Sequence, residues 1–144
     1  MINDIVDFSS IQHDRIRRLC DDVNAAARSD KQRLFDELAD LVNSHEASDR
    51  KIVHPSVVDH TTGGGADAVA CMVEAGGILR EVSELQRLGT GDITFDARFA
   101  NLHQALLDHM AHEESAEFPR LRRYVPVQRL HAMVSEAHDV QTMR

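Results

Sequence analysis

Two motifs of the same form place an imidazole and a carboxylate four residues apart, His45 with Asp49 and His109 with Glu113. If both segments are helical, positions i and i+4 lie one turn apart on one face, so each pair converges on a small volume. His13 adds a third imidazole from a separate segment. Imidazole nitrogens and carboxylate oxygens together suit iron, manganese or zinc ions. These five residues therefore predict a metal centre.

The predicted ligands fall on the apolar faces of their segments, in line with aliphatic residues three or four positions away. Burying three imidazoles and two carboxylates in an apolar interior costs several kcal/mol for each unpaired charge, which a cation would offset. For any one histidine taken alone, a core side chain paired with a neighbouring carboxylate is the better interpretation. The joint occurrence of all three favours the metal centre.

Long helices must position these residues, because apolar side chains recur at steps of three and four and no segment alternates with a period of two. Four helices are predicted, at residues 9–27, 29–52, 66–88 and 95–117. Ser9-x-x-Gln12 and Ser29-x-x-Gln32 have the form of capping boxes at the first two helix starts. Pro55 and the Phe118-Pro119 pair are expected to end the second and fourth helices.

A loop is expected from Pro55 through the glycine-rich stretch 60–65, before the third helix. A short fifth helix, docked by Leu130 and Val134, is expected over 127–136, after the fourth. Short connections between long helices favour antiparallel neighbours. The predicted fold is all-α, an up-down-up-down four-helix bundle with a short C-terminal helix. It forms one domain over 1–144, with a core at about 8–123 and a helical tail at 124–144.

The second half of the chain resembles the first. The segment from Phe35 through His45 to Pro55 overlays the segment from Phe99 through His109 to Pro119, with a constant offset of 64 residues. Two helical hairpins of this kind are expected to pack as a pseudo-twofold pair.

Together these motifs resemble the hemerythrin-like, or HHE cation-binding, family of non-haem iron proteins, over about residues 8–123. The resemblance implies a diiron centre within the bundle, bridged by two carboxylates and capped by imidazoles, that binds oxygen or a related small oxidant. Carried over residue by residue, it implies metal ligands at His13, His45, Asp49, His109 and Glu113.

Two positions depart from the family pattern. Overlaying His13 on the third helix reaches Ala75, where the family usually supplies a histidine. Asp49 stands where the family usually has glutamate, and its shorter side chain reaches less far as a bridge. Glu74 could replace the missing imidazole if a bulge at Gly76-Gly77 turned it inward, and this alternative ranks below an unfilled position.

The remaining candidates have simpler interpretations. Glu46 is expected to face water rather than metal. Cys20 and Cys71 are expected to pack in the core, and the basic segment 120–123 to be solvated. Surface positions are expected for the six other histidines, of which His112 is the nearest candidate ligand: His54, His60, His103, His112, His131 and His138.

Composition excludes several classes of protein. With 24 acidic and 16 basic residues the formal charge is −8, which disfavours nucleic acid and anionic membrane as partners. Aromatic residues make up only 4%, too few for stacking on single-stranded nucleic acid. The N-terminus has no basic region followed by an apolar run, which predicts a cytoplasmic protein. No nucleophile with a paired base, phosphate-binding loop or organic-cofactor fingerprint is present, so no catalytic residue is assigned.

Three functions remain compatible with the sequence. The first is a non-haem iron protein that binds oxygen, peroxide or nitric oxide for sensing, storage or detoxification, with weak chemistry on the ligand as an open point. The second is a metal-poor bundle, degenerate at Ala75 and Asp49, that serves as a structural or partner-binding module. The third is a mononuclear site with two histidines and a carboxylate, for iron or another divalent metal. Metal content per chain separates them.

Overall fold

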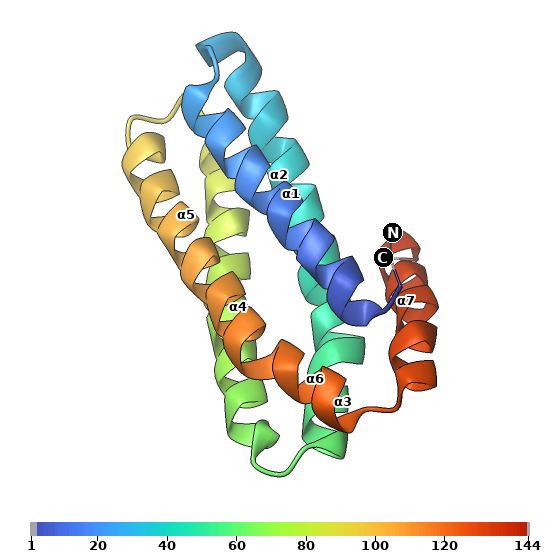
Figure 1. Ribbon diagram of the computed structural model, residues 1–144. Helices are drawn as coiled ribbons and strands as arrows, with labels where there is room; N and C mark the ends of the chain where they lie inside the picture. The colour runs from blue at the N-terminus through green and yellow to red at the C-terminus, as the bar shows by residue number, and fades with distance from the viewer. Residues whose placement is uncertain (1–2, 144) are drawn as a thin grey trace.

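The computed structural model describes residues 3–143, and every regular element in that range is a helix. The long helices lie side by side, and the last helix lies along the flank of the first two (Figure 1). In chain order the elements are α1 (Ile5–Ala25), α2 (Arg28–Ser48), the π-helix η1 (Asp49–Val53), α3 (His54–His60), α4 (Gly64–Leu88), α5 (Phe95–His112), the π-helix η2 (Glu113–Glu117), α6 (Phe118–Tyr124) and α7 (Val127–Thr142).

Both predicted capping boxes are wrong. Helix α1 begins one turn earlier than expected, because the Asp4 side chain accepts a hydrogen bond from the backbone N–H of Asp7 at 2.9 Å and Ser9 lies buried inside the helix. Helix α2 begins after Ala27 without a side-chain cap. Gln32 instead accepts a hydrogen bond from the Thr90 N–H at 2.9 Å, which ties α2 to the turn after α4.

Neither proline ends its helix. The His54 N–H bonds to the Asp49 carbonyl five residues back, as in a π-helix, and Pro55 occupies the first turn of α3. The Phe118 N–H bonds to the Glu113 carbonyl in the same way, and Pro119 opens α6. A proline in the first turn of a helix is tolerated because its missing N–H has no carbonyl to reach there. Most of the loop expected after Pro55 is therefore helix α3.

Glycine sets both ends of α4. Gly63, the residue before the helix, has φ 79°, and Gly89, the residue after it, has φ 78°, a region that side chains disfavour. Between them α4 is regular, and it passes through Gly76-Gly77 without a bulge. The wide turns of this bundle lie in η1 and η2 instead.

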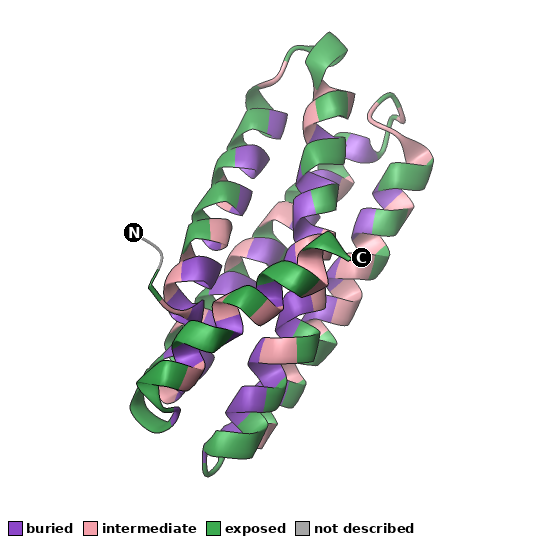
Figure 2. Ribbon diagram, turned by 90° about the vertical axis from the view of Figure 1, so that its right-hand side faces the viewer, coloured by how far each residue is buried: buried purple, intermediate pink, exposed green. Residues whose placement is uncertain are grey.

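The buried face of each helix turns inward (Figure 2) and forms two separate apolar cores. The upper core lies toward the end of the bundle where α1 connects to α2 and α4 connects to α5. It is centred on Phe35, Phe95 and Phe99. The lower core gathers the first turns of α1 with α3, α6 and α7, around Phe118 and Met133. The predicted ligands lie between the two cores, on α1, α2 and α5 and at the first residues of η1 and η2.

Helix α7 is longer than the predicted fifth helix and packs against α1 and α2. Leu130 is buried in the lower core as expected, and Val134 packs at its edge. Near the end of α7, the Gln141 amide exchanges two hydrogen bonds with that of Gln12, at 2.8 and 3.0 Å. Within residues 3–143 no helix is both long and apolar enough to cross a membrane.

Candidate metal centre

The five predicted ligands lie together in the layer between the two apolar cores. None exposes more than 1% of its surface, although all five are titratable. His13 comes from α1, His45 from the last turn of α2, and His109 from the last turn of α5. Asp49 and Glu113 are the first residues of η1 and η2. Because π-helical turns occur frequently at functional sites, their position at both carboxylates supports a functional centre.

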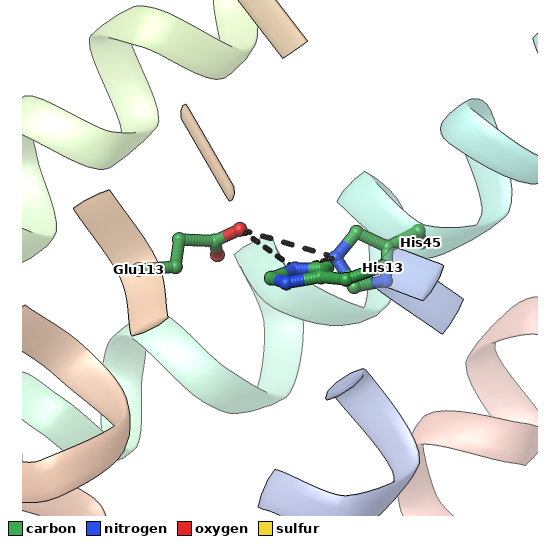
Figure 3. A group of neighbouring side chains, drawn as sticks. All are labelled: His13, His45 and Glu113. Atoms are coloured by element: carbon green, nitrogen blue, oxygen red, sulfur yellow. Dashed lines mark hydrogen bonds and ion pairs between the residues drawn. The ribbon is translucent and has the colours of Figure 1, made fainter. Parts of the chain in front are cut away.

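Glu113 occupies the middle of the group. Its Oε1 lies 3.3 Å from Nε2 of His13 and 3.9 Å from Nε2 of His45, and Figure 3 shows the carboxylate pointing toward both rings. The same oxygen lies 3.5 Å from Nε2 of His109. The two rings of His13 and His45 meet at their Nε2 atoms, 3.1 Å apart, and Asp49 Oδ2 lies 3.1 Å from Nε2 of His45. One carboxylate thus faces imidazoles from three helices.

Glu46 lies inside the centre, so the expectation that it faces water is wrong. It is 4% exposed, and its Oε1 lies 3.0 Å from Nε2 of His109 on the opposite side of the bundle. Its Oε2 is buried with no hydrogen-bond partner. One ligand atom from each of His45, Glu46, Asp49 and Glu113 lies within 4.8 Å of the others. Adjacent helical positions Glu46 and His45 both face inward because the interior here lies between four helices and is wide.

His54 and Glu117 are also part of the centre, and the sequence did not point to either. His54 is 1% exposed rather than on the surface, and its Nδ1 lies 2.7 Å from Oε2 of the fully buried Glu117. One ring nitrogen of His54 and one oxygen each of Glu113 and Glu117 lie within 4.8 Å of one another. A regular 3.6-residue period misses His54, five residues after Asp49, because η1 rotates the chain relative to an α-helix. Glu117 lies four residues after Glu113, the same spacing that separates Glu113 from His109, and this spacing was the available signal for it.

The four buried imidazoles share one pattern of hydrogen bonds: each has an acceptor at Nδ1. His13 Nδ1 lies 2.7 Å from Glu114, and His45 Nδ1 lies 2.7 Å from Oε1 of Gln12. An acceptor at Nδ1 holds the proton there and leaves the Nε2 lone pair available, which is how metal-binding histidines are usually oriented. The two other pairs are His54 with Glu117 at 2.7 Å and His109 with Glu74 at 2.9 Å.

Buried polar atoms that lack a hydrogen-bond partner are also concentrated in this layer. Seven buried side-chain nitrogen or oxygen atoms within residues 3–143 have no hydrogen-bond partner, and all seven belong to this layer. Leaving such atoms unpaired costs about 1–3 kcal/mol each, and more when the group is charged. Their residues are Glu46, Asp49, His54, Glu113 and Glu117. A bound cation would satisfy them, so the donor set fits a metal.

The electrostatics of the layer also favour a bound cation. Burial and the nearby negative charge of Asp49 raise the pKa of Glu113 well above its usual value. For Asp49, burial acts to raise the pKa, but the adjacent His45 outweighs it and holds the pKa below the usual value. Without a cation, the two neighbouring carboxylates repel each other, which favours the protonated form of Glu113. A metal ion would release that proton by taking its place.

The buried histidines also differ from one another in pKa, according to the groups around each ring. Burial, with a further contribution from the His45 ring, lowers the pKa of His13 to about 4. Burial would also lower the pKa of His109, but the carboxylates of Glu46 and Glu74 outweigh it and raise this pKa to about 9. The pKa of each buried imidazole therefore depends on which charged groups face it.

The structure also places Ala75, where the family usually has a histidine, and Glu74, the residue that could have replaced it. Ala75 is buried on α4 and lines a cleft together with Glu46 and His54. Glu74 does not turn into the centre. Its two oxygens instead accept hydrogen bonds from the Nδ1 positions of His109 and His112, at 2.9 and 2.8 Å, at the edge of the bundle.

His112 was expected at the surface, and Cys20 and Cys71 in the core. His112 is half-buried and lies 3.6 Å from the Cys71 sulfur, outside the central layer. Cys20 and Cys71 are both buried and free, in agreement with a packing role.

A helical bundle with buried imidazoles and carboxylates between two apolar cores defines a class of cation-binding proteins. The sequence matches the model of the hemerythrin HHE cation-binding domain over residues 4–121, and the chain belongs to that family. Comparison with curated proteins and with solved structures finds no match. Cation binding within an all-helical bundle is thereby established as the family property of this domain.

Proposed function

We propose that this chain holds a non-haem iron centre of two ions, which binds oxygen or a related small oxidant such as peroxide or nitric oxide for sensing, storage or detoxification. One observation carries the proposal. Four carboxyl groups and four imidazoles are buried in one layer, and the partnerless buried atoms all fall within it. Four ionised carboxylates are balanced by two divalent cations, and by one only in part.

The roles of the side chains follow from their positions. Glu113, which faces imidazoles from three helices, would be the central carboxylate ligand, and the shorter Asp49 would assist from η1. The histidines would cap the ions through Nε2 while Gln12, Glu74 and neighbouring carboxylates hold Nδ1. An up-down-up-down order of the four long helices would enclose this layer between the two cores and keep bulk water out. A bound iron pair would supply Lewis acidity and reversible electron transfer toward the ligand.

Access for a small ligand comes from one side of the bundle. A cleft lined by Glu46, His54, Ala75 and Gly76 reaches the centre between α2 and α4, and Arg50 lies along it. The small side chain at Ala75 leaves this approach open, which favours a diatomic or peroxide ligand over a larger one. The acidic chain is not expected to bind nucleic acid or membrane.

The test is the metal content of the purified chain together with its optical spectrum. Two irons per chain with near-ultraviolet charge-transfer absorption, changed by oxygen, peroxide or nitric oxide, would support the proposal. One metal per chain would favour a mononuclear site. A chain that binds no metal after reconstitution with ferrous iron would contradict the proposal and favour a structural or partner-binding bundle.

A further inference from the structure

The two halves of the bundle exchange an imidazole for an apolar side chain at matching positions. Adding 62 to His13 gives Ala75, and subtracting 64 from Phe118 gives His54. In one half, Phe118 stacks on His13 with ring centroids 5.4 Å apart. In the other half His54 takes the position of the phenylalanine, and it shares a cleft with Ala75, the residue in the position of the histidine. In this half the imidazole lies at the start of the helix that follows the π-helical turn.

We propose that His54 supplies the imidazole that Ala75 lacks, and that it binds the second metal ion through Nε2 while Glu117 holds its Nδ1. This inference rests on the proposed two-metal centre and names one of its ligands. It adds a ligand on α3, an element that carries none of the five predicted ligand residues.

The geometry of His54 matches that of the three predicted histidine ligands. Its ring is 1% exposed, and a carboxylate oxygen lies 2.7 Å from Nδ1. Its Nε2 differs from theirs in one respect. In His13, His45 and His109 this atom lies within 3.3 Å of a polar atom of the layer, whereas Nε2 of His54 is buried with no partner. An imidazole oriented by a carboxylate and left with an unused buried lone pair fits a metal ligand.

The carboxylates around His54 complete the second half of the centre. Glu113, Glu117 and His54 offer ligand atoms within 4.8 Å of one another, and Glu113 belongs equally to the group formed with His13 and His45. Glu117 keeps its Oε1 buried and partnerless after Oε2 has bonded to the imidazole. Glu113 therefore lies between two sets of ligands, one on each side.

The first experiment counts Co²⁺ ions bound by the metal-free full-length chain, followed by visible absorption. Wild type is expected to bind two Co²⁺ ions, and His54→Ala one, with the affinity of the second site reduced by more than about 100-fold, beyond the 10–100-fold typical of residues that only orient a ligand. The matched control is His60→Ala, which removes an exposed imidazole from the same helix. Adding Ala75→His to His54→Ala is expected to restore the second ion.

The second experiment rests on a count in the wild-type chain, and a variant serves only to assign one of the resonances. In the Co²⁺-loaded wild-type chain, each histidine bound through Nε2 gives one exchangeable, hyperfine-shifted Nδ1–H resonance, and four are expected. His54→Gln is expected to remove one of them.

The outcomes separate the two proposals. A wild-type chain that binds two ions with only three such resonances, or His54→Ala that keeps the second site at full affinity, would overturn the role of His54 and leave the two-metal centre intact. A wild-type chain that binds one ion or none overturns the two-metal centre, and the ligand with it.

Discussion

In the first half of the chain α2 passes through η1 into α3, and in the second half α5 passes through η2 into α6. The two paths match residue for residue, with a five-residue π-helix followed by a proline in each. Even the acceptors for the two matching histidines correspond, since Gln12 holds His45 and Glu74, 62 residues later, holds His109. The backbone is thus repeated while the side chains at the centre have changed. The halves can be compared as two versions of one site.

The largest expected difference lies between the two matching carboxylates. Glu113→Ala should lower metal affinity by more than about 100-fold and Asp49→Ala by less, because Glu113 faces three imidazoles and belongs to three ligand groups, whereas Asp49 belongs to one. Titration of both metal-free variants with ferrous iron under anaerobic conditions measures this. Equal losses, or a greater loss with Asp49→Ala, would mean that the halves contribute equally and that the shorter side chain is no handicap.

Removing the metal should destabilise both halves together. At a free concentration 100 times its dissociation constant, a metal ion stabilises the folded chain by about 2.7 kcal/mol, which corresponds to several degrees in Tm. The physical reason is the set of partnerless atoms that remains in the layer after the cation leaves. Thermal unfolding followed by circular dichroism before and after chelation provides the measurement. An unchanged Tm after verified metal removal would show that these atoms find partners in another way.

The residues that orient the matching histidines should have a smaller and unequal effect. Removal of such a residue typically costs 10–100-fold in metal affinity. Glu74→Ala should fall near the upper end and Gln12→Ala near the lower end, because a carboxylate increases the basicity of the imidazole more than a neutral amide does. Competition with a chromophoric chelator gives both affinities. If Gln12→Ala has the larger effect, then packing at Gln12 matters more than charge at Glu74.

Helix α7 packs mainly on the first half of the chain, against α1, α2 and η1, and the smallest expected effect tests that support. Gln141→Ala removes hydrogen bonds to Gln12 and to the Ser48 hydroxyl, at 2.8–3.0 Å. Each neutral hydrogen bond contributes about 1 kcal/mol to folding, but these three reach the metal only through Gln12 and His45. Metal affinity should therefore fall less than tenfold, and the number of bound ions should stay the same. His138→Ala, an exposed change on the same helix, is the control. Loss of an entire ion from Gln141→Ala would show that α7 holds the centre in place rather than supporting it.

Sequence periodicity predicted the helices well where the period is constant. The four long segments, the internal repeat and the inward position of His13, His45 and His109 all follow from steps of three and four. Helix ends were predicted less well. Ser9 and Ser29 have the form of caps, but Asp4 competes successfully for the first turn of α1, and the second helix starts without any side-chain cap.

The missed residues of the centre have separate causes. After Asp49 the backbone turns by π-helical rather than α-helical hydrogen bonds, so His54, five residues on, is brought to the inner face. The proline expected to end each helix is accommodated by the same kind of turn. Glu117 lies four residues after Glu113, on the face that α-helical spacing also predicts, and only its acidic type argued for the surface. Glu46 was missed for a different reason, since one helix contributes two adjacent residues to a wide interior.

The layer between the two apolar cores also determines how cooperatively the chain unfolds. Within residues 3–143, the upper core is held by α1, α2, α4 and α5, whereas the lower core depends on short helices and on α7. With a cation bound between them, the ligands link both cores, and calorimetric and van't Hoff enthalpies of unfolding should agree as for one cooperative unit. Without it, amide hydrogen exchange should accelerate first in α3, α6 and α7, since the lower core can then open below the free energy of global unfolding. The centre would then set the size of the cooperative unit in addition to binding a ligand.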